Sequence, residues 1–418
     1  MHQEHYQKTF LVTGGTGFLG SHIAVRLLED GNRVLLLARG RKDCNAFERV
    51  RRLLDWFDVE EGHRSRLEVL EGDLEQPLPG INVRDAESVT ERVDEIIHCA
   101  SDTSLSARKR EQVERTNVKG LQNLLNFVQE SRCRAFHLIS TAYVAGKAGG
   151  LCPENFGWVE AFHNVYEETK FHAEQIAAKR CAQNGITLYV HRPSIVYGDS
   201  TSGKTLLFNA LYYPIRTLHY FQRLYTKDIL ENNGKKAKEM GVGLNRNGKL
   251  HLPVRIESLD ASGVNLIPVD YFVRAFMAIR KEIPEGGVFH IVNPRNTTIQ
   301  QLVDYTERFF QLAGIRTADR SEFINRPRNG LELLFENQIH AYGSYMRDSR
   351  VFENSRTAAF LAKQNIVCPD FDYDIFELCM RYAMDVDWGR LLYPEENTTC
   401  VKKSPMDTKR FSHRKNVV

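Results

Sequence analysis

Thr13-Gly14-Gly15-Thr16-Gly17-Phe18-Leu19-Gly20 is a glycine-rich motif near the start of a 418-residue chain. It follows the apolar run 10–12 and precedes an amphipathic segment at 21–30, so its glycines join a buried strand to a helix. In that setting Gly14 makes the tight turn, Gly17 lets the backbone approach a pyrophosphate, and Gly20 lets the helix pack on the sheet. The alternative is a glycine-rich turn that binds nothing.

The same alternation of strands and helices continues through the first 200 residues. Apolar runs at 33–38, 67–70, 95–99, 135–139 and 186–191 indicate further strands, and amphipathic segments at 46–57, 112–129 and 166–183 indicate helices. This order predicts an α/β fold with a doubly wound, parallel Rossmann sheet. Ligands should then bind beyond the carboxyl ends of the strands.

The regular alternation of predicted strands and helices ends after Gly198, which indicates that a second lobe begins there. We expect a dinucleotide-binding domain over 1–200, with its sheet rejoined by about 265–293 through a strand at 287–292, and a smaller, mainly helical C-terminal substrate lobe over 201–264 and 294–395. Thr297-Thr298 should cap a helix that runs to about 312. Residues 396–418 form a basic tail, which is either solvated or docks an acidic carrier protein or a membrane surface.

The composition is that of a soluble globular protein. Hydrophobic residues make up 42% and charged residues 26% of the chain, and no run approaches the roughly 18 apolar residues of a membrane span. A net charge of +3 gives no reason to expect a nucleic-acid partner. The eight cysteines are scattered, so we expect reduced thiols, no metal site and a cytoplasmic location.

The residues at the ends of the second and third strands bear on the choice of cofactor. An enzyme that uses NAD places an acid after the second strand, to bind the ribose hydroxyls. This chain has Arg39, Arg41 and Lys42 there, and an arginine can pair with a 2′-phosphate. The cofactor should therefore be NADP(H), unless these are solvated loop charges. The full set of expected cofactor contacts is Thr13, Gly14, Thr16, Gly17, Phe18, Leu19, Gly20, Arg39, Asp73, Leu74, Lys170, Pro193, Ser194 and Ile195.

A hydroxyl, a phenol and an ammonium group form the candidate catalytic set. Thr141 follows the strand at 135–139, and Tyr166 and Lys170 lie one turn apart on one face of a helix. Tyr166 would donate a proton to a carbonyl oxygen, Thr141 would hydrogen-bond that oxygen, and Lys170 would lower the pKa of the phenol and hold the ribose. The alternative is a chance surface pair. Asn117 would either fix a helix kink or a relay water, or be an ordinary polar helix residue.

Several strings resemble those of extended short-chain dehydrogenases/reductases, in the thioester reductase and fatty acyl-CoA reductase branch. They are Gly14-x-x-Gly17-x-x-Gly20, Val69-Leu70-Glu71-Gly72-Asp73-Leu74, Ile139-Ser140-Thr141-Ala142-Tyr143-Val144, Asn164-x-Tyr166-Glu167-x-Thr169-Lys170, Arg192-Pro193-Ser194-Ile195-Val196-Tyr197-Gly198 and Asn265-x-Ile267-Pro268-Val269-Asp270-Tyr271. The resemblance spans residues 9 to about 293.

This resemblance implies NADPH-dependent reduction of an acyl thioester, carried by coenzyme A or an acyl carrier protein, to an aldehyde or onward to an alcohol. Apolar and aromatic residues between 206 and 225 would line an acyl trench or form plain core. The alternatives are another short-chain oxidoreductase, a sugar-nucleotide epimerase or dehydratase, and a redox-sensing binding protein without catalysis. The acyl chain, the carrier and the oligomeric state stay open, and a peripheral membrane contact is compatible with the tail.

Overall fold

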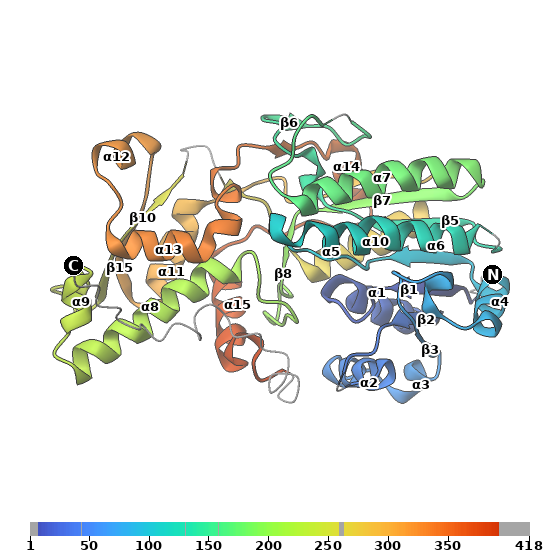
Figure 1. The fold of residues 1–418 in the computed structure, drawn as a ribbon, viewed down its shortest axis with the longest axis horizontal. Helices are drawn as coiled ribbons and strands as arrows, with labels where there is room; N and C mark the ends of the chain where they lie inside the picture. Colours follow the sequence, from blue (N-terminus) through green and yellow to red (C-terminus); the bar gives the residue numbers. More distant parts are fainter. Residues whose placement is uncertain (1–6, 43, 130, 158, 259–262, 393–418) are drawn as a thin grey trace, which may run out of the picture.

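The computed structural model describes residues 7–42, 44–129, 131–157, 159–258 and 263–392 (Figure 1). Its centre is a seven-stranded parallel sheet with the order β13-β7-β5-β4-β1-β2-β3. The strands are β1 (Thr9–Thr13), β2 (Arg33–Ala38), β3 (Leu67–Glu71), β4 (Glu95–His98), β5 (Ala135–Ile139), β7 (Thr187–Pro193) and β13 (Gly287–Ile291). The strand order reverses between β1 and β4, the place where a doubly wound sheet binds ligands.

Helices cover both faces of this sheet, because its strands carry apolar side chains on both sides. One face packs against α1 (Phe18–Glu29), α2 (Ala46–Trp56) and α10 (Val269–Glu282), and the other against α4 (Val83–Arg92), α6 (Gly120–Val128) and α7 (Val165–Gln183). A short α3 (Glu61–Arg64) precedes β3. The predicted Rossmann architecture is confirmed, including the return of the chain through β13.

The helix predicted at 112–129 is not a regular α-helix. It consists of α5 (Arg110–Glu114), a π-helical turn over Arg115–Lys119, and α6. Asn117 lies buried in the π-turn. A π-turn inside a helix is a local distortion that often accompanies a functional site, and here it lies beside the cleft described below.

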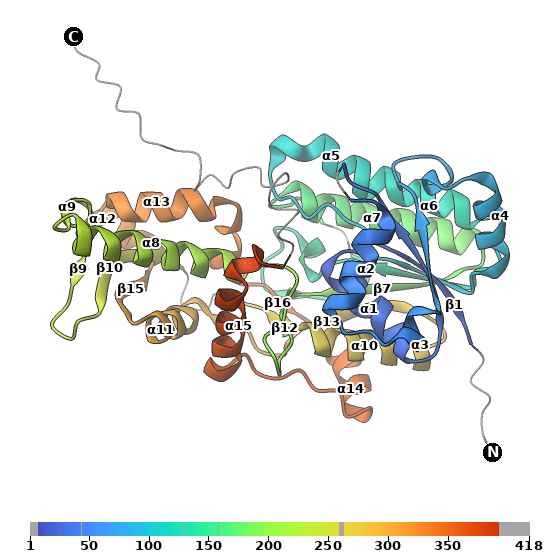
Figure 2. The same cartoon turned by 90° about the horizontal axis from the view of Figure 1, so that it is seen from below.

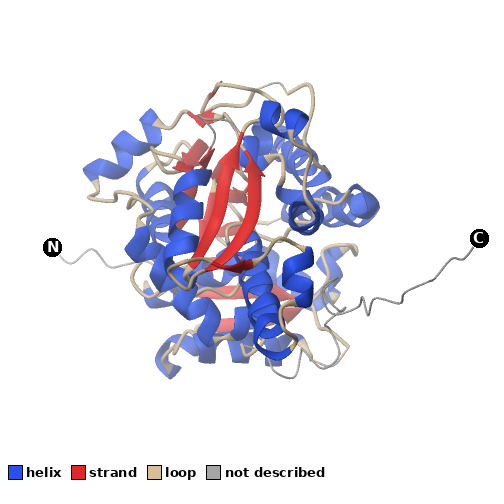
Figure 3. Cartoon of the chain, turned by 90° about the vertical axis from the view of Figure 1, so that its left-hand side faces the viewer, coloured by secondary structure: helices blue, strands red, loops and turns tan. Residues whose placement is uncertain are grey.

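The second lobe contains a sheet that the sequence analysis did not predict (Figure 3). Its three strands have the order β15-β10-β9, with β15 (Leu312–Ala318), β10 (Leu250–Glu257) and β9 (Gly243–Leu244). Around it lie α8 (Tyr212–Glu231), α9 (Lys235–Glu239), α11 (Ile299–Phe310), α12 (Arg320–Asn325), α13 (Gly330–Ile339) and α15 (Tyr373–Asp385). The lobe is thus helical with a small sheet, and the strand at 312–318 replaces part of the helical region expected after 313.

Three two-stranded sheets and one returning helix complete the fold. The pairs are β8 (Ile195–Tyr197) with β12 (Leu266–Pro268), β6 (Leu151–Cys152) with β16 (Val351–Phe352), and β11 (Gly263–Val264) with β14 (Thr297–Thr298). Helix α14 (Ser355–Lys363) packs beside α10 and β13 (Figure 2), and its Leu361 is part of the core around the Rossmann sheet. Residues 294–395, which we assigned wholly to the substrate lobe, therefore contribute to both lobes.

A capping box explains where α11 begins. The Thr298 side chain accepts a hydrogen bond from the Gln301 amide, and the Gln301 side chain accepts one from the Thr298 amide, which is a complete capping box. The predicted cap at Thr297-Thr298 is thus confirmed, although α11 ends at Phe310 rather than near 312. The basic tail predicted at 396–418 lies outside the described residues.

Candidate active site

A cleft of about 370 Å³ lies at the carboxyl ends of four central strands. Gly14 follows β1, Cys99 follows β4, Thr141 follows β5, and Pro193 ends β7, and all four residues line the cleft. Parallel strands bring these ends to one edge of the sheet. Helix α7 adds Tyr166 and Lys170 to the same cleft.

The glycine loop has the geometry that a bound dinucleotide requires. Gly14 has a φ of +70°, and a Cβ placed on it would lie 2.4 Å from the Ala100 amide nitrogen. A Cβ on Gly20 would lie 2.4 Å from the Gly14 carbonyl oxygen, so Gly20 allows α1 to approach the loop. A Cβ on Gly17 would lie 3.2 Å from the Gly14 carbonyl oxygen, and Gly17 is the N-cap of α1 and lines the cleft. The start of α1 therefore faces the cleft as an anion-binding site.

Thr141, Tyr166 and Lys170 come together as the sequence analysis expected. Thr141 and Tyr166 both line the cleft, where the Thr141 hydroxyl donates a hydrogen bond to the Pro193 carbonyl oxygen at 3.5 Å and accepts one from the Tyr143 amide at 3.3 Å. The Lys170 ammonium is buried and donates a hydrogen bond to the Ile139 carbonyl oxygen at 2.6 Å. The cleft floor thus carries two hydroxyls and one cation from β5 and α7.

The acidity of these groups differs in part from expectation. Burial raises the pKa of Tyr166 to about 12, and the nearby Thr141 hydroxyl offsets only part of that rise. Burial also lowers the pKa of Lys170 to about 8, against the charge of Glu174, which raises it. The expected lowering of the Tyr166 pKa by Lys170 is therefore not found, since burial has the larger effect. Tyr166 remains a protonated donor at neutral pH.

A buried ion pair between Glu174 and Arg192 lies one helical turn from Lys170. Glu174, one turn after Lys170 on α7, accepts hydrogen bonds from the Arg192 guanidinium at 2.9 and 2.6 Å. The Ser140 hydroxyl donates to the same carboxylate at 2.5 Å. The Glu174 carboxylate therefore joins α7 to the ends of β5 and β7.

Asn117 fixes the π-turn beside the cleft. Its side-chain oxygen accepts hydrogen bonds from the Asp102 amide at 2.7 Å and the Ser101 hydroxyl at 3.0 Å. Its side-chain nitrogen donates to the Asp102 carbonyl oxygen and to the Thr169 hydroxyl, each at 3.0 Å. Asn117 thus lies in a distorted turn of the helix, and its buried side chain connects the loop after β4 to α7.

Arg49, which was not among the predicted site residues, lies beside the glycine loop. The Arg39 guanidinium lies 3.5 Å from the Asp73 carboxylate and 4.0 Å from that of Glu75. Arg49 of α2 donates hydrogen bonds to the Arg39 carbonyl oxygen at 2.5 Å and to the Thr16 hydroxyl at 3.0 Å. Because Arg49 lies on a helix well after the glycine motif, its position gave no signal in the sequence.

The structure separates the expected cofactor contacts into two groups. Gly14, Gly17, Phe18, Leu19, Gly20, Lys170, Pro193, Ser194 and Ile195 all line the cleft. The Ser194 hydroxyl is buried there, without a hydrogen-bond partner among the described residues, which suits a polar ligand. Thr13, Thr16, Arg39, Asp73 and Leu74 do not belong to the lining.

Contacts elsewhere in the fold explain why residues of the second group do not line the cleft. The Thr13 hydroxyl pairs with the His98 ring at 2.8 Å, and Leu74 is part of the core on one face of the sheet. Arg39 and Asp73 pair with each other near the start of α2. The Thr13 and Leu74 side chains are therefore engaged within the fold rather than in the lining of the cleft.

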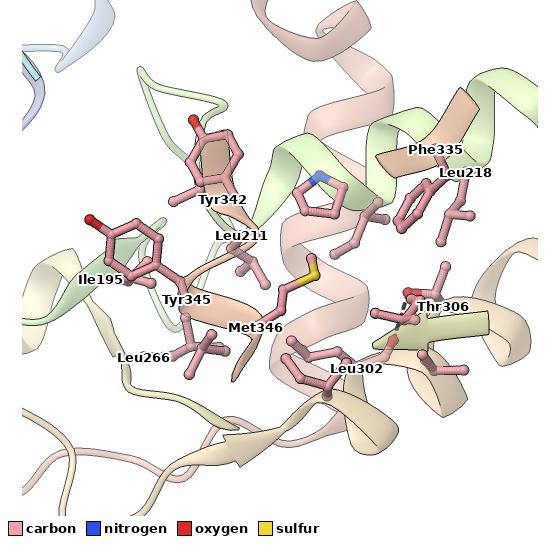
Figure 4. A pocket seen from close by; sticks show the side chains of 17 residues that line it. Ile195, Leu211, Leu218, Leu266, Leu302, Thr306, Phe335, Tyr342, Tyr345 and Met346 are labelled. Carbon is pink, nitrogen blue, oxygen red and sulfur yellow. Dashed lines mark hydrogen bonds between the residues drawn. The ribbon is translucent and has the colours of Figure 1, made fainter. Parts of the chain in front are cut away.

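A second, apolar cavity of about 70 Å³ adjoins the cleft (Figure 4). Four residues line both spaces, namely Ile195, Ala210, Tyr342 and Tyr345. Of the residues expected to form an acyl trench, Leu211 and Leu218 line the apolar cavity and Leu207 lines the cleft. Tyr212, Phe221 and Tyr225 are instead buried in the core of the second lobe.

Comparison with known families identifies the chain. The family model described as "Male sterility protein", an NAD-binding family, matches residues 12–276, which is more than half of the chain. The chain belongs to this family. As a member of the male sterility protein family, it is an extended short-chain dehydrogenase/reductase of the thioester reductase and fatty acyl-CoA reductase branch, and its glycine loop fits a nicotinamide dinucleotide.

Curated relatives of this family member are much larger proteins. It is 28% identical over 211 residues to the hybrid PKS-NRPS synthetase pydA of Acremonium sp, covering 49% of the chain and 5% of that protein. It is 21% identical over 390 residues to a linear gramicidin synthase of Brevibacillus parabrevis, covering 89% of the chain and 7% of that protein. The chain therefore spans only a small part of these relatives' length.

A solved structure shares the whole fold. The terminal R domain from the myxalamid PKS-NRPS biosynthetic pathway has a TM-score of 0.70 and 20% identity, with 92% of each chain covered. This likeness supports the reductase-type Rossmann fold. In the described part of the chain, no helix has both the length and the apolar character needed to cross a bilayer.

Proposed function

We propose that this protein reduces an acyl thioester to an aldehyde by hydride transfer from NADPH. The observation that carries the proposal is the convergence of Thr141, Tyr166 and Lys170 at the ends of β5 and α7, beside the glycine loop. A reduced nicotinamide dinucleotide supplies the hydride when it is bound. The chain's own residues supply the proton and the hydrogen bonds.

The Thr141 and Tyr166 hydroxyls act on the carbonyl oxygen of the thioester. Both donate hydrogen bonds to this oxygen as negative charge develops on it, and Tyr166 transfers its proton to give a hemithioacetal. The hemithioacetal then collapses to the aldehyde, its C–S bond breaks, and the thiolate leaves and takes up a proton. Lys170 keeps a positive charge within the buried floor of the cleft during proton transfer.

NADPH rather than NADH is proposed because two arginines lie close to the glycine loop. Arg49 donates hydrogen bonds to the Thr16 hydroxyl and to the Arg39 carbonyl oxygen, and a 2′-phosphate placed there would pair with guanidinium groups. Replacing Arg39 with Ala should lower kcat/KM for NADPH by about tenfold to a hundredfold, the range for a charge-assisted hydrogen bond, with little effect on NADH. Arg33→Ala, at the other end of β2, is the matched control.

The thioester carrier is proposed from two directions. Its relatives include a hybrid PKS-NRPS synthetase, a linear gramicidin synthase subunit and a putative fatty acyl-CoA reductase of Drosophila melanogaster, and a thiolation-reductase di-domain shares the fold with a TM-score of 0.67. A phosphopantetheine thioester, on a carrier protein or in coenzyme A, is therefore the proposed substrate.

The test is to offer NADPH with acyl-CoA thioesters of graded length and to measure both NADPH consumption and free thiol. We expect both to rise together, with one thiol released for each aldehyde formed. NADPH consumption without thiol release would mean that the C–S bond is not broken, which would contradict the proposal. No NADPH consumption with any thioester, in a protein that binds NADPH, would contradict the proposal.

A further inference from the structure

The tyrosine pair Tyr342 and Tyr345 forms the wall between the cleft and the apolar cavity. Both residues line both spaces. Figure 4 shows their rings at one end of the cavity, with the hydroxyls pointing away from Leu218 and Phe335 at the other end. An elongated ligand that extends from Tyr166 into the cavity passes this pair together with Ile195 and Ala210, which also line both spaces.

The cavity beyond the wall suits a hydrocarbon chain. Leu218, Leu302 and Phe335 give it an apolar surface. The Thr306 hydroxyl also lines it but donates a hydrogen bond to the Leu302 carbonyl oxygen at 2.6 Å, so it does not need a partner in the cavity. Apolar cavities of this kind stay dry and bind apolar ligands. The Met346 side chain adds to the same apolar surface.

Tyr345 is held in place by the first turn of the catalytic helix. Its hydroxyl donates a hydrogen bond to the Glu167 carboxylate at 2.8 Å and accepts one from the Asn164 side chain at 2.8 Å. Asn164 caps α7, and Glu167 directly follows Tyr166. The ring of Tyr345 is therefore positioned by the same turn that positions the proton donor.

A buried charge cluster, made of Arg350, Asp348 and Glu167, ties this wall to the loop after β5. Arg350 pairs with Asp348 at 2.6 Å, lies 3.9 Å from Glu167, and donates a hydrogen bond to the Gly146 carbonyl oxygen at 2.6 Å. Its guanidinium also lies 4.8 Å from the centre of the Tyr143 ring, which lines the cleft. The segment that contains Tyr345 and Arg350 is thus held both by the first turn of α7 and by the loop after β5.

We propose that Tyr345 is a specificity-determining residue, whose fixed ring sets how far an acyl chain reaches from the cleft into the apolar cavity. This inference rests on the proposed thioester substrate. Because the ring is held by hydrogen bonds and buried charges, the protein discriminates chains by length rather than adapting to each. Short acyl groups stay on the cleft side of the ring, and longer ones depend on the space behind it.

The experiment compares kcat/KM for dodecanoyl-CoA and butanoyl-CoA, with saturating NADPH. Tyr345→Ala should raise the ratio of dodecanoyl to butanoyl activity by roughly tenfold, the scale of discrimination in hydrophobic pockets. Leu302→Phe, which fills the apolar cavity away from the cleft, should lower that ratio by a similar factor. Tyr345→Phe should keep the parent ratio, because the ring stays. Leu333→Phe is the matched surface control, since Leu333 on α13 is 48% exposed.

The outcomes separate this inference from the proposed function. An active parent whose ratio is unchanged by both Tyr345→Ala and Leu302→Phe would overturn the inference and leave the thioester reaction intact. If Tyr345→Ala does not fold, Leu302→Phe alone decides, because it acts on the cavity without touching the charge cluster. A parent inactive with both thioesters would refute the proposed function, and the inference with it.

Discussion

Tyr166 is the residue on which the proposed chemistry depends most directly. It is half-buried and lines the cleft together with Thr141, so its hydroxyl is in place to donate a proton. Tyr166→Phe should lower NADPH oxidation with an acyl thioester by about a hundredfold to ten-thousandfold, the usual contribution of a general acid. Steady-state kinetics measure this. Tyr220→Phe, at an exposed position of α8, is the control, and equal rates in the parent and in Tyr166→Phe would contradict the assigned role.

Lys170 should give the reaction a pH limit on the alkaline side. Burial lowers its pKa from the usual 10.5 to about 8, so the ammonium is lost as the pH rises through about 8. If the charge is required, kcat should fall above that pH. In the folded protein the depressed pKa also means that the unfolded chain binds more protons between pH 8 and 10.5, so the contribution of Lys170 to stability should increase with pH in that window.

A pH profile of kcat tests the Lys170 prediction. Lys170→Met should be nearly inactive across the range, whereas Lys179→Met, at an exposed position of the same helix, should keep the alkaline limb. A flat profile in the parent to about two units above the pKa of Lys170 would show that the charge on Lys170 is not needed.

The residues of the site could be predicted from the sequence better than their electrostatics. The spacing of Tyr166 and Lys170 on one helix, and the place of Thr141 after a strand, brought the three side chains together as expected. The sign of the Tyr166 shift was wrong because spacing shows which charges are near but not how deeply a group is buried. Arg49 was missed for a related reason, since its contact with Thr16 depends on how α2 packs.

At the scale of elements, the π-turn at Arg115–Lys119 makes Asn117 a test of local geometry. Asn117 is buried and satisfies backbone groups of Asp102 as well as the Thr169 hydroxyl. Asn117→Ala should lower the free energy of unfolding by about 1–3 kcal/mol, because these groups lose their partner. Denaturant titration measures this. Asn126→Ala, at an exposed position of α6, should change stability by less than about 0.5 kcal/mol, and equal losses in both variants would contradict the role.

The strands of the Rossmann sheet were predictable because each is a continuous apolar run, as burial on both faces requires. The strand at Leu250–Glu257 was not predicted, although its side chains alternate between buried and more exposed positions. It contains Pro253 and several polar residues, which weaken a strand prediction. Helix α4 was missed because its surface is mostly polar and only Ala86 and Val89 are buried.

At the scale of the whole molecule, the charge cluster of Arg350, Asp348 and Glu167 joins the C-terminal part of the chain to the catalytic helix. Arg350 is 3% exposed. Arg350→Ala leaves two carboxylates buried without their cation, which should lower the free energy of unfolding by about 3–5 kcal/mol. Thermal and denaturant unfolding measure this, with Arg347→Ala, an exposed neighbour, as the control. Equal stability of the two variants would mean that the cluster does not hold the molecule together.

The order of the lobes along the chain was partly predictable. Runs of strand and helix predicted the Rossmann sheet and its late seventh strand, whereas the return of α14 to that sheet depends on contacts with α10 and β13 that no short sequence pattern reveals. Leu361 and Cys368 look like ordinary apolar residues of any helical region, yet they are buried in the first core.

The return of α14 to the Rossmann sheet affects how this protein can be recombined with its homologues. A chimaera made by a single exchange after residue 293 would combine α10 and β13 of one protein with α14 of the other, so the apolar contact between them would join surfaces from two different sequences. Swaps of acyl preference between homologues should therefore use two junctions, one before α11 and one ahead of β16, so that α14 travels with the sheet it covers.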